Sequence, residues 1–392
     1  MSSYTEEKSE SPKARLIAFY LPQYHPIPEN DEWWGKGFTE WTNVAKAKPM
    51  FPGHYQPHLP ADLGFYDLRV PETRIAQAEM AKQYGIEGFC YWHYWFAGRR
   101  LLERPFDEVL KSGEPNFPFC LGWANHTWSG IWYGCPDDIL IEQTYPGLED
   151  YKAHFYKVLE AFSDSRYIKV DNKPLFVVFR PAELPDAKLF TDYWRELAAK
   201  SGLKGLYFVG VAFDPSWVPD RHGFDAAVLM NPDWARVQTP VLSPYQVKPN
   251  LVFEKIYNGF ASLSFKKLSK IKYGLPLVYS YKEVINNAFL KEDVGFEIHP
   301  SIFANWDNTP RSGMNGKVFL DSTPELFRTH LKAALEKVEK KTPEKKLIFV
   351  RSWNEWAEGN YLEPDQKFGR AYLEVIKDEV LEKQESLKQV AI

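Results

Sequence analysis

The sequence predicts a single (β/α)8 barrel, the TIM-barrel form of an α/β protein, with long βα loops over its C-terminal mouth. Three observations predict this fold. Short apolar runs alternate with amphipathic stretches from one end of the chain to the other. The runs are apolar almost without interruption, as expected of parallel strands that are covered on both faces. The length of 392 residues suits one large domain with elaborate loops.

Eight of the apolar runs are assigned to the strands of the barrel. The first is "RLIAFYLPQY" and the last is "KLIFVRSW". A ninth run at 275–281 is assigned to an insertion. The eight expected strands lie at 15–24, 86–95, 117–125, 173–181, 206–213, 224–232, 298–306 and 346–353.

Four stretches between and after these strands have the periodicity of amphipathic helices. In one of them, Thr323 is a candidate N-cap and Pro324 occupies the first helical position. The pattern departs from an ideal barrel in two places, because 214–223 is too short for a helix with its turns and because strands six and seven are far apart. The four expected helices lie at 149–162, 186–202, 322–341 and 370–384.

The chain shows no internal repeat and no linker that would divide it. Residues 1–13 are expected to form a disordered polar tail, and residues 14–392 one catalytic barrel domain. The segment 25–70 is rich in Pro, Gly and Trp and is predicted to be a long first loop over the barrel mouth. No apolar run approaches the roughly 20 residues that cross a bilayer, and the N-terminus lacks the apolar core of a signal peptide. We therefore expect a cytoplasmic protein without an integral membrane segment.

Composition narrows the class of partner. A net charge of −4 gives no indication of nucleic acid or of an anionic membrane as partner. Aromatic residues make up 16% of the chain, including 14 Trp and 22 Tyr, whose rings also carry polar groups. This excess favours an oligo- or polysaccharide as partner, with a purely structural role in the core as the alternative. The three cysteines are scattered, and Cys90 and Cys120 are expected to be buried thiols. The oligomeric state is not indicated.

Polar and aromatic residues follow seven of the eight expected strands. In a (β/α)8 barrel these strand ends meet at one mouth, where active sites lie. The rings could stack on sugars and the polar groups could bind sugar hydroxyls, while the alternative is that each ring caps the barrel core. The candidate substrate-binding residues are Tyr24, His25, Tyr91, Trp92, His93, Asn125, His126, Trp128, Arg180, Asp233, Trp234, Trp306, Asp307, Asn354 and Trp356.

The candidate catalytic residues are Glu355 and Glu358, in the stretch "SWNEWAEGNYLEP" after the last strand. Glycoside cleavage needs two carboxyl groups with different tasks at one anomeric carbon. A spacing of three residues on a helical turn places both on one face. Two like charges that close push their pKa values apart, which separates an acid from a base. The alternative is a solvated pair at a helix N-terminus, which the helix dipole favours.

Signals for metals and cofactors are missing from the sequence. His25, His93 and His126 come from three different strands without a metal-binding spacing, so hydroxyl contacts are favoured over a metal site. There is no G-x-G-x-x-G, P-loop, G-x-S-x-G or D-x-D motif. We therefore expect no cofactor and no metal.

Four segments carry a resemblance to a known family. "RLIAFYLPQYHPIPEN", "YGIEGFCYWHYWFAG", "LGWANHTW" and "SWNEWAEGNYLEPD" resemble the WbsX-like, or glycoside hydrolase family 99-like, domains of bacterial polysaccharide gene clusters. The resemblance covers roughly residues 15–380. Such domains are often described as lipopolysaccharide-biosynthesis proteins, O-antigen proteins or glycosyltransferases.

The resemblance implies a mechanism and roles for two residues. Characterised family 99 members are endo-α-mannosidases and endo-α-mannanases on a (β/α)8 barrel, and they retain anomeric configuration. One glutamate deprotonates the sugar's own 2-hydroxyl, which attacks C1, and the other protonates the leaving group. The W-N-E-W-x-E-G motif matches Trp353 to Gly359, so Glu355 would be the base and Glu358 the acid/base. Ala357 stands where the mannosidases carry histidine, which leaves mannose open as the substrate.

Three functions remain open at this stage. The first is a retaining glycoside hydrolase acting within α-linked glycans, with Trp33, Trp34, Trp41, Trp128 and Trp132 as further aromatic platforms. The second is a glycosyltransferase of O-antigen, lipopolysaccharide or capsule synthesis. The third is a glycan-binding protein without catalysis.

Overall fold

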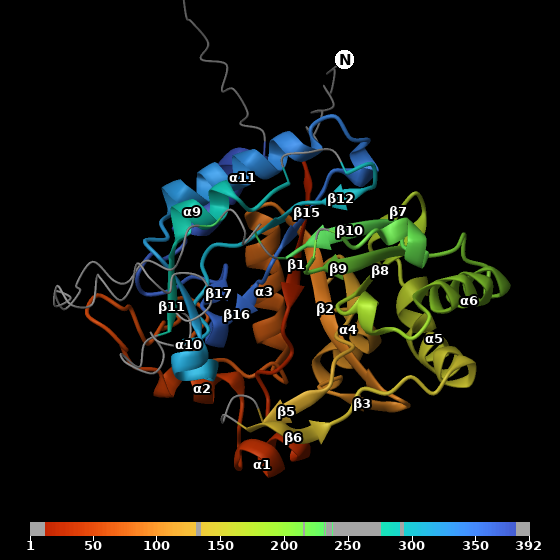
Figure 1. Ribbon diagram of the computed structural model, residues 1–392, viewed down its shortest axis with the longest axis horizontal. Coiled ribbons are helices and arrows are strands. Elements are labelled where there is room, and N and C mark those ends of the chain that lie inside the picture. The colour runs from red at the N-terminus through yellow and green to blue at the C-terminus, as the bar shows by residue number, and fades with distance from the viewer. Residues whose placement is uncertain are drawn as a thin grey trace, which may run out of the picture.

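The computed structural model describes residues 12–130, 135–214, 216–230, 232, 237, 276–290 and 294–381, shown in Figure 1. Most of the expected N-terminal tail lies outside these residues. Among the described residues, no helix combines the length and apolar character that crossing a membrane requires.

All eight expected strands form and make one parallel sheet that curves into a barrel. The pairing order runs β1, β2, β4, β8, β9, β10 and then to strand seven. Strand seven is interrupted at Pro300, so that β12 pairs with β10 and β13 pairs with β15. Because β15 also pairs with β1, the two short pieces close the ring. The bounds are β1 Arg15–Tyr20, β2 Ile86–Phe96, β4 Phe119–Trp123, β8 Lys173–Val178, β9 Tyr207–Ala212, β10 Ala226–Leu229, β12 Ile298–His299, β13 Ser301–Ile302 and β15 Leu347–Val350.

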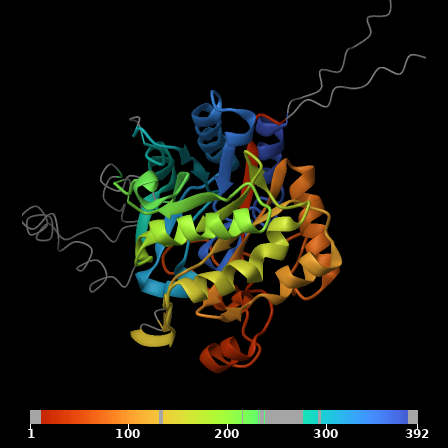
Figure 2. The ribbon, with the colours of Figure 1, turned by 90° about the vertical axis from the view of Figure 1, so that its right-hand side faces the viewer.

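Helices cover the outside of this ring. In Figure 2, α5 and α6 cross the face turned toward the viewer. The predicted cap is confirmed, because the Thr323 side chain accepts a hydrogen bond from the Leu326 amide at the start of α11. The longer helices are α3 Pro71–Gln83, α4 Arg104–Ser112, α5 Leu148–Ser163, α6 Ala187–Lys200, α11 Pro324–Val338 and α12 Ala371–Val380.

The two irregular connections are confirmed as well. The segment between β9 and β10 holds only a short 3-10 helix, η3 (Pro219–His222). Of the long connection between strands six and seven, the described part forms β11 (Leu277–Ser280) and α9 (Tyr281–Asn286). β11 pairs with β14 (Lys317–Leu320) in a separate sheet, so the ninth apolar run lies outside the barrel as expected.

Loop elements gather at the end of the barrel toward which the strands point. Figure 1 shows α1, α2, α10 and the β5–β6 hairpin at the lower end of the view, and both views place α1 there. The bounds are α1 Pro28–Trp34, α2 Glu40–Lys46, β5 Trp128–Gly130, β6 Cys135–Ile141 and α10 Thr309–Ser312. A loop-built mouth at the C-terminal strand ends is the usual place of a site in this fold.

The alternation of side chains along the strands separates two layers. Phe19 of β1 stacks on Trp92 of β2, with 4.6 Å between ring centres, inside the barrel. The next residue, Tyr20, points outward and donates a hydrogen bond to Gln77 of α3. Both layers are buried. The inward layer forms the floor below the mouth, and the outward layer joins the sheet to its helices.

Candidate active site

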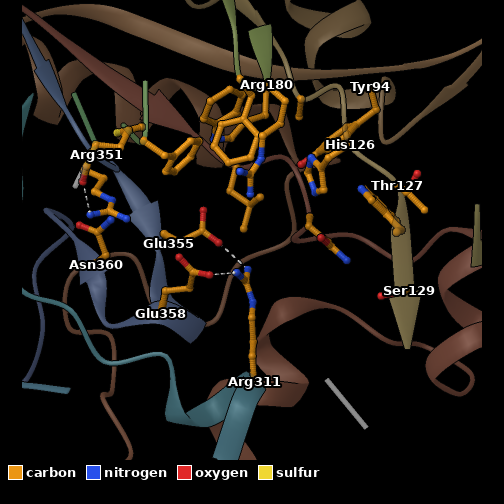
Figure 3. Close-up of a pocket in the computed structure, with 18 of the residues that line it drawn as sticks. Tyr94, His126, Thr127, Ser129, Arg180, Arg311, Arg351, Glu355, Glu358 and Asn360 are labelled. Atoms are coloured by element: carbon orange, nitrogen blue, oxygen red, sulfur yellow. Dashed lines mark hydrogen bonds and ion pairs between the residues drawn. The ribbon is translucent and has the colours of Figure 1, made fainter. Parts of the chain in front are cut away.

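A cavity of about 460 Å³ opens at the C-terminal mouth of the barrel. Its lining comes from both the strand ends and the loops above them, as Figure 3 shows for part of it. Aromatic rings and charged groups share the surface. The lining residues are Leu21, Gln23, Trp34, Trp92, Tyr94, Ala124, His126, Thr127, Trp128, Ser129, Phe179, Arg180, Phe213, Met230, Trp306, Arg311, Arg351, Glu355, Glu358 and Asn360.

Both candidate glutamates face this cavity and share one guanidinium. Arg311 of α10 pairs with Glu355 through Nη2 and with Glu358 through Nη1, the second contact at 2.8 Å. Its Nε donates to Glu40 of α2 at 3.0 Å. Figure 3 shows Arg311 reaching the two carboxyl groups from one side. One buried cation therefore binds three carboxylates, one from α2 and two from the turn after β15.

The electrostatics of this cluster favour a proton on it. Burial raises the pKa of Glu355 to about 7, Arg311 opposes the shift, and the charges of Glu358 and Glu40 add to it. Burial also lowers the pKa of the neighbouring Arg351 to about 10, against the attraction of the two glutamates. Three carboxylates and two guanidinium groups leave one negative charge, which a proton at pH near 7 can neutralise.

The backbone of the turn explains why both carboxyl groups face inward. Residues 354–355 form β16 and residues 360–361 form β17, an antiparallel pair that the 3-10 helix η6 (Trp356–Glu358) connects. Gly359 ends η6 with φ +58°, and a Cβ there would lie 2.9 Å from the amide nitrogen of Asp307. That amide donates to the Glu358 carbonyl at 2.7 Å. Only glycine allows this close approach of the two loops.

Buried polar contacts fix the turn to the barrel. The Asn354 side chain accepts from the Leu21 amide at 2.8 Å and donates to the Leu21 carbonyl at 3.0 Å. The Tyr24 hydroxyl accepts from the Trp356 amide at 3.1 Å. The Trp356 indole donates to Glu363 at 2.6 Å and stacks on Tyr361. These residues therefore hold Glu355 and Glu358 in place from below.

The structure brings five of the predicted binding residues to the cavity together with both predicted catalytic residues. The stacked position of Trp92 on Phe19 leaves it in the inner layer, at the floor. The five binding residues that line the cavity are Trp92, His126, Trp128, Arg180 and Trp306.

Four other predicted binding residues support the residues around the cavity without lining it. Tyr24, Asn354 and Trp356 brace the turn that carries Glu355 and Glu358, as described above, and are fully buried. Asn125 holds the backbone of Arg180, with Oδ1 2.7 Å from the Arg180 amide nitrogen. For these four, direct substrate contact is corrected to support of the residues that line the cavity.

A further four lie away from the cavity. Tyr91 and His93 point to the outer layer, where Tyr91 packs on Phe106 of α4 and His93 bonds His154 of α5. The alternation along β2 explains this, because it sends Trp92 inward and both neighbours outward. His25 is buried against the Pro22 carbonyl, 3.0 Å from Nδ1.

Asp307 is the fourth predicted binding residue that lies away from the cavity of about 460 Å³. It accepts hydrogen bonds from His54, Gln56 and Thr309 and lines a separate cavity of about 110 Å³ on the other side of Gly359. The predicted residues Asp233, Trp234 and Trp132 lie outside the described residues. Of the proposed platforms in the first loop, Trp34 lines the cavity, while Trp41 is buried under η6 against Trp356.

Sequence reasoning missed several lining residues. Arg311 lies in a polar loop after strand seven, and no local pattern distinguishes it from a surface arginine. Arg351 directly follows β15 and precedes the turn that carries Glu355 and Glu358, and a charge at the end of an apolar run is the signal that could have found it. Tyr94 and Asn360 also line the cavity and were not among the candidates.

The class of protein follows from comparison with known proteins. Residues 16–376 match the family described as "Glycosyltransferase WbsX", and the chain belongs to this family. Two curated relatives, both described as "Uncharacterized protein WxcX" and both from Xanthomonas campestris pv. campestris, are each 36% identical over 369 residues. The match covers 94% of this chain and 50% of each relative, so the chain spans about half the length of the curated relatives it matches.

Solved structures share the fold. A protein described as glycoside hydrolase-like has a TM-score of 0.54 at 17% identity, covering 97% of this chain and 98% of the other. The GH99 endo-α-mannosidase from Bacteroides thetaiotaomicron has a TM-score of 0.51 at 17% identity, covering 93% of this chain and 95% of the other. The solved structures show the shared barrel fold, and the description of the family is that of a carbohydrate-active enzyme.

The fit of Gly359 against Asp307 can be tested with two glycine variants. Gly359→Ala and Gly369→Ala both place an alanine at positive φ, which costs about 1 kcal/mol. Only position 359 adds a collision, so its variant should unfold with a free energy lower by roughly 1–3 kcal/mol more. Urea denaturation measures both values. Equal losses in the two variants would contradict a close approach at 359.

The raised pKa of Glu355 predicts a stability effect that depends on pH. Between about pH 4.5 and 7 the unfolded chain ionises this carboxyl while the folded protein retains its proton, so folded stability falls as pH rises. Glu355→Gln removes this loss. We expect the variant to match the wild type at pH 4 and to exceed it by up to about 3 kcal/mol at pH 8.

Chemical denaturation across this pH range measures the difference, with Glu339→Gln on the exposed surface of the chain as the control. The control should follow the wild type at every pH. A Glu355→Gln variant that is less stable than the wild type at pH 8 would show that its ion pair outweighs its burial.

Proposed function

We propose that this protein is a retaining glycoside hydrolase that cleaves α-linked glycans within the chain, using Glu355 and Glu358. The observation that carries the proposal is that both carboxyl groups enter one ring-lined cavity and are held by the same arginine. The volume of about 460 Å³ accommodates a short oligosaccharide segment.

The first step follows the route that the family 99 resemblance implies. The Glu355 carboxylate takes the proton of the 2-hydroxyl, and that oxygen bonds to C1 as the bond from C1 to the leaving oxygen breaks. Glu358 gives its proton to the leaving oxygen. The sugar is then a 1,2-anhydro intermediate, and the other fragment departs from the cavity with the leaving oxygen as a free hydroxyl.

In the second step the roles reverse. The Glu358 carboxylate takes a proton from water, the water oxygen bonds to C1, and the bond between C1 and O2 breaks. Glu355 returns its proton to O2. Two inversions at C1 give net retention, and no metal or cofactor enters the balance.

The electrostatics of the free site support Glu355 as the base. A base works best with a pKa near the working pH, because a more basic carboxylate removes the weakly acidic hydroxyl proton more readily. Burial gives Glu355 a pKa of about 7. Glu358 is more exposed, with 24% of its side chain accessible against 11% for Glu355. It is therefore better placed to exchange protons with a leaving group and with water.

A glycosyl transferase reaction is the second candidate, and the description of the family favours it. The same two carboxyl groups could pass the sugar to an acceptor hydroxyl in place of water. Glycan binding without catalysis is the third. Product analysis distinguishes these three outcomes on one set of substrates.

The test incubates the protein with α-linked mannan and with bacterial surface polysaccharides and analyses the products by mass spectrometry. New reducing ends that retain the anomeric configuration support the hydrolase. Elongated products support transfer, and heat of binding in calorimetry without any product supports a binder.

The variants Glu355→Gln and Glu358→Gln should each lose turnover by on the order of 10²–10⁴-fold, while the affinity for the glycan changes little. Each variant removes one proton transfer and leaves the shape of the cavity intact. The exposed control Glu339→Gln should keep full turnover. Substantial turnover in either cavity variant would remove that residue from the mechanism.

A further inference from the structure

Three arginines line the cavity, and their positive charges are balanced differently. Arg311 is bound by three carboxylates. Arg351 donates to the Met230 carbonyl at 2.8 Å, lies over the Trp306 ring at 4.0 Å, and is attracted by the two catalytic carboxylates. The charges of these two arginines therefore belong to the catalytic cluster.

Arg180 differs from both. Its guanidinium carbon lies 4.3 Å from the centre of the Phe213 ring and 5.0 Å from that of Phe179. Within the described part of the chain, its only carboxylate partner is Glu183, 3.9 Å from Nε and half exposed. A surface pair of this length contributes little. The aromatic rings therefore hold the guanidinium in place and leave its charge largely unbalanced.

Two hydrogen bonds from one buried side chain fix the backbone of Arg180. The buried Asn125 side chain accepts from the Arg180 amide at 2.7 Å and donates to its carbonyl at 2.9 Å. Asn125 also donates to the Tyr145 hydroxyl at 3.0 Å. Asn125 therefore fixes the position at which Arg180, which follows β8, enters the cavity.

His126 lies beside Arg180 on the cavity wall. Burial and the charge of Arg180 lower its pKa to about 4, so the ring is neutral near pH 7. Its Nδ1 is buried and has no hydrogen-bond partner among the described residues. A neutral imidazole keeps one donor, and a bound group could use it. In the view of Figure 3, Arg180 and His126 lie above the two glutamates, and Arg311 enters from below.

Guanidinium groups that stack on rings keep their edge free for hydrogen bonds. That edge is planar and matches a carboxylate or a phosphate with two parallel bonds. The catalytic carboxylates repel an anion, so an anionic group would be held at Arg180 and away from them. A glycan with one acidic substituent would then enter the cavity in a single orientation.

We propose that the cavity takes a glycan carrying an anionic group, a carboxylate or a phosphate, and that Arg180 binds this group with His126 beside it. The proposal rests on the proposed function only in naming a glycan as the ligand. It extends that function by naming the chemical class of the substrate and the residue that binds the anionic group.

The test measures binding of three probes by isothermal titration calorimetry: glucuronate, glucose and inorganic phosphate. The wild type should bind at least one of the anions roughly tenfold or more tightly than glucose, with an affinity that falls as salt rises. Binding of glucuronate alone identifies a carboxylate, and binding of phosphate alone identifies a phosphate. Equal binding of all three, or binding of none, overturns the proposal.

Two variants assign the effect to Arg180. Arg180→Gln should bring the preference for the anion below twofold, and Arg221→Gln, which removes an exposed arginine of η3, should leave it unchanged. Anion preference that persists in Arg180→Gln overturns the assignment. The probes are not cleaved, so these results are independent of hydrolysis. If the anion binds and no product forms from any glycan, the subsite stands and the proposed hydrolase fails.

Discussion

The site depends on one buried guanidinium that binds three carboxylates. Arg311 links α2 through Glu40 and the turn after β15 through Glu355 and Glu358. Without its charge, three carboxylates would share a buried space, and breaking such a network costs roughly 3–5 kcal/mol. With it, the cluster retains one unbalanced negative charge, counting Arg351. The same arrangement thus stabilises the mouth of the barrel and prepares one carboxyl group to hold a proton near neutral pH.

The rest of the mouth serves to place this cluster. The Asn354 side chain ties the turn that carries Glu355 and Glu358 to the end of β1, and Gly359 lets this turn lie against the loop that carries Asp307. That loop continues into α10 and so delivers Arg311. Burial of Glu355 at this mouth is the main cause of its raised pKa. The contacts that support the turn and the charge of Arg311 therefore come from different segments of the chain but meet at one point.

Much of this could be predicted from sequence, for physical reasons. A strand buried on both faces must be apolar throughout, so the eight strands were visible as runs, and the carboxyl pair was visible because it follows the last of them. The role of Arg311 could not be predicted from the sequence, because its partners Glu355 and Glu40 lie 44 and 271 residues away and such pairs leave no local pattern. Tyr91 and His93 lie in the outer layer because alternation along β2, and not proximity to its end, decides which side chains face the cavity. A buried tyrosine or histidine next to an inward tryptophan must face the helices.

The most direct test of the central claim is a titration of the Glu355 carboxyl by ¹³C NMR, assigned by comparison with Glu355→Gln. In the wild type the resonance should titrate near pH 7, in keeping with the pKa of about 7 that burial gives this group. In Glu40→Gln it should titrate at lower pH, because Arg311 then has one carboxylate fewer to balance and the repulsion from Glu40 is gone. A wild-type midpoint between pH 4 and 5, or one that Glu40→Gln leaves unchanged, would contradict the account.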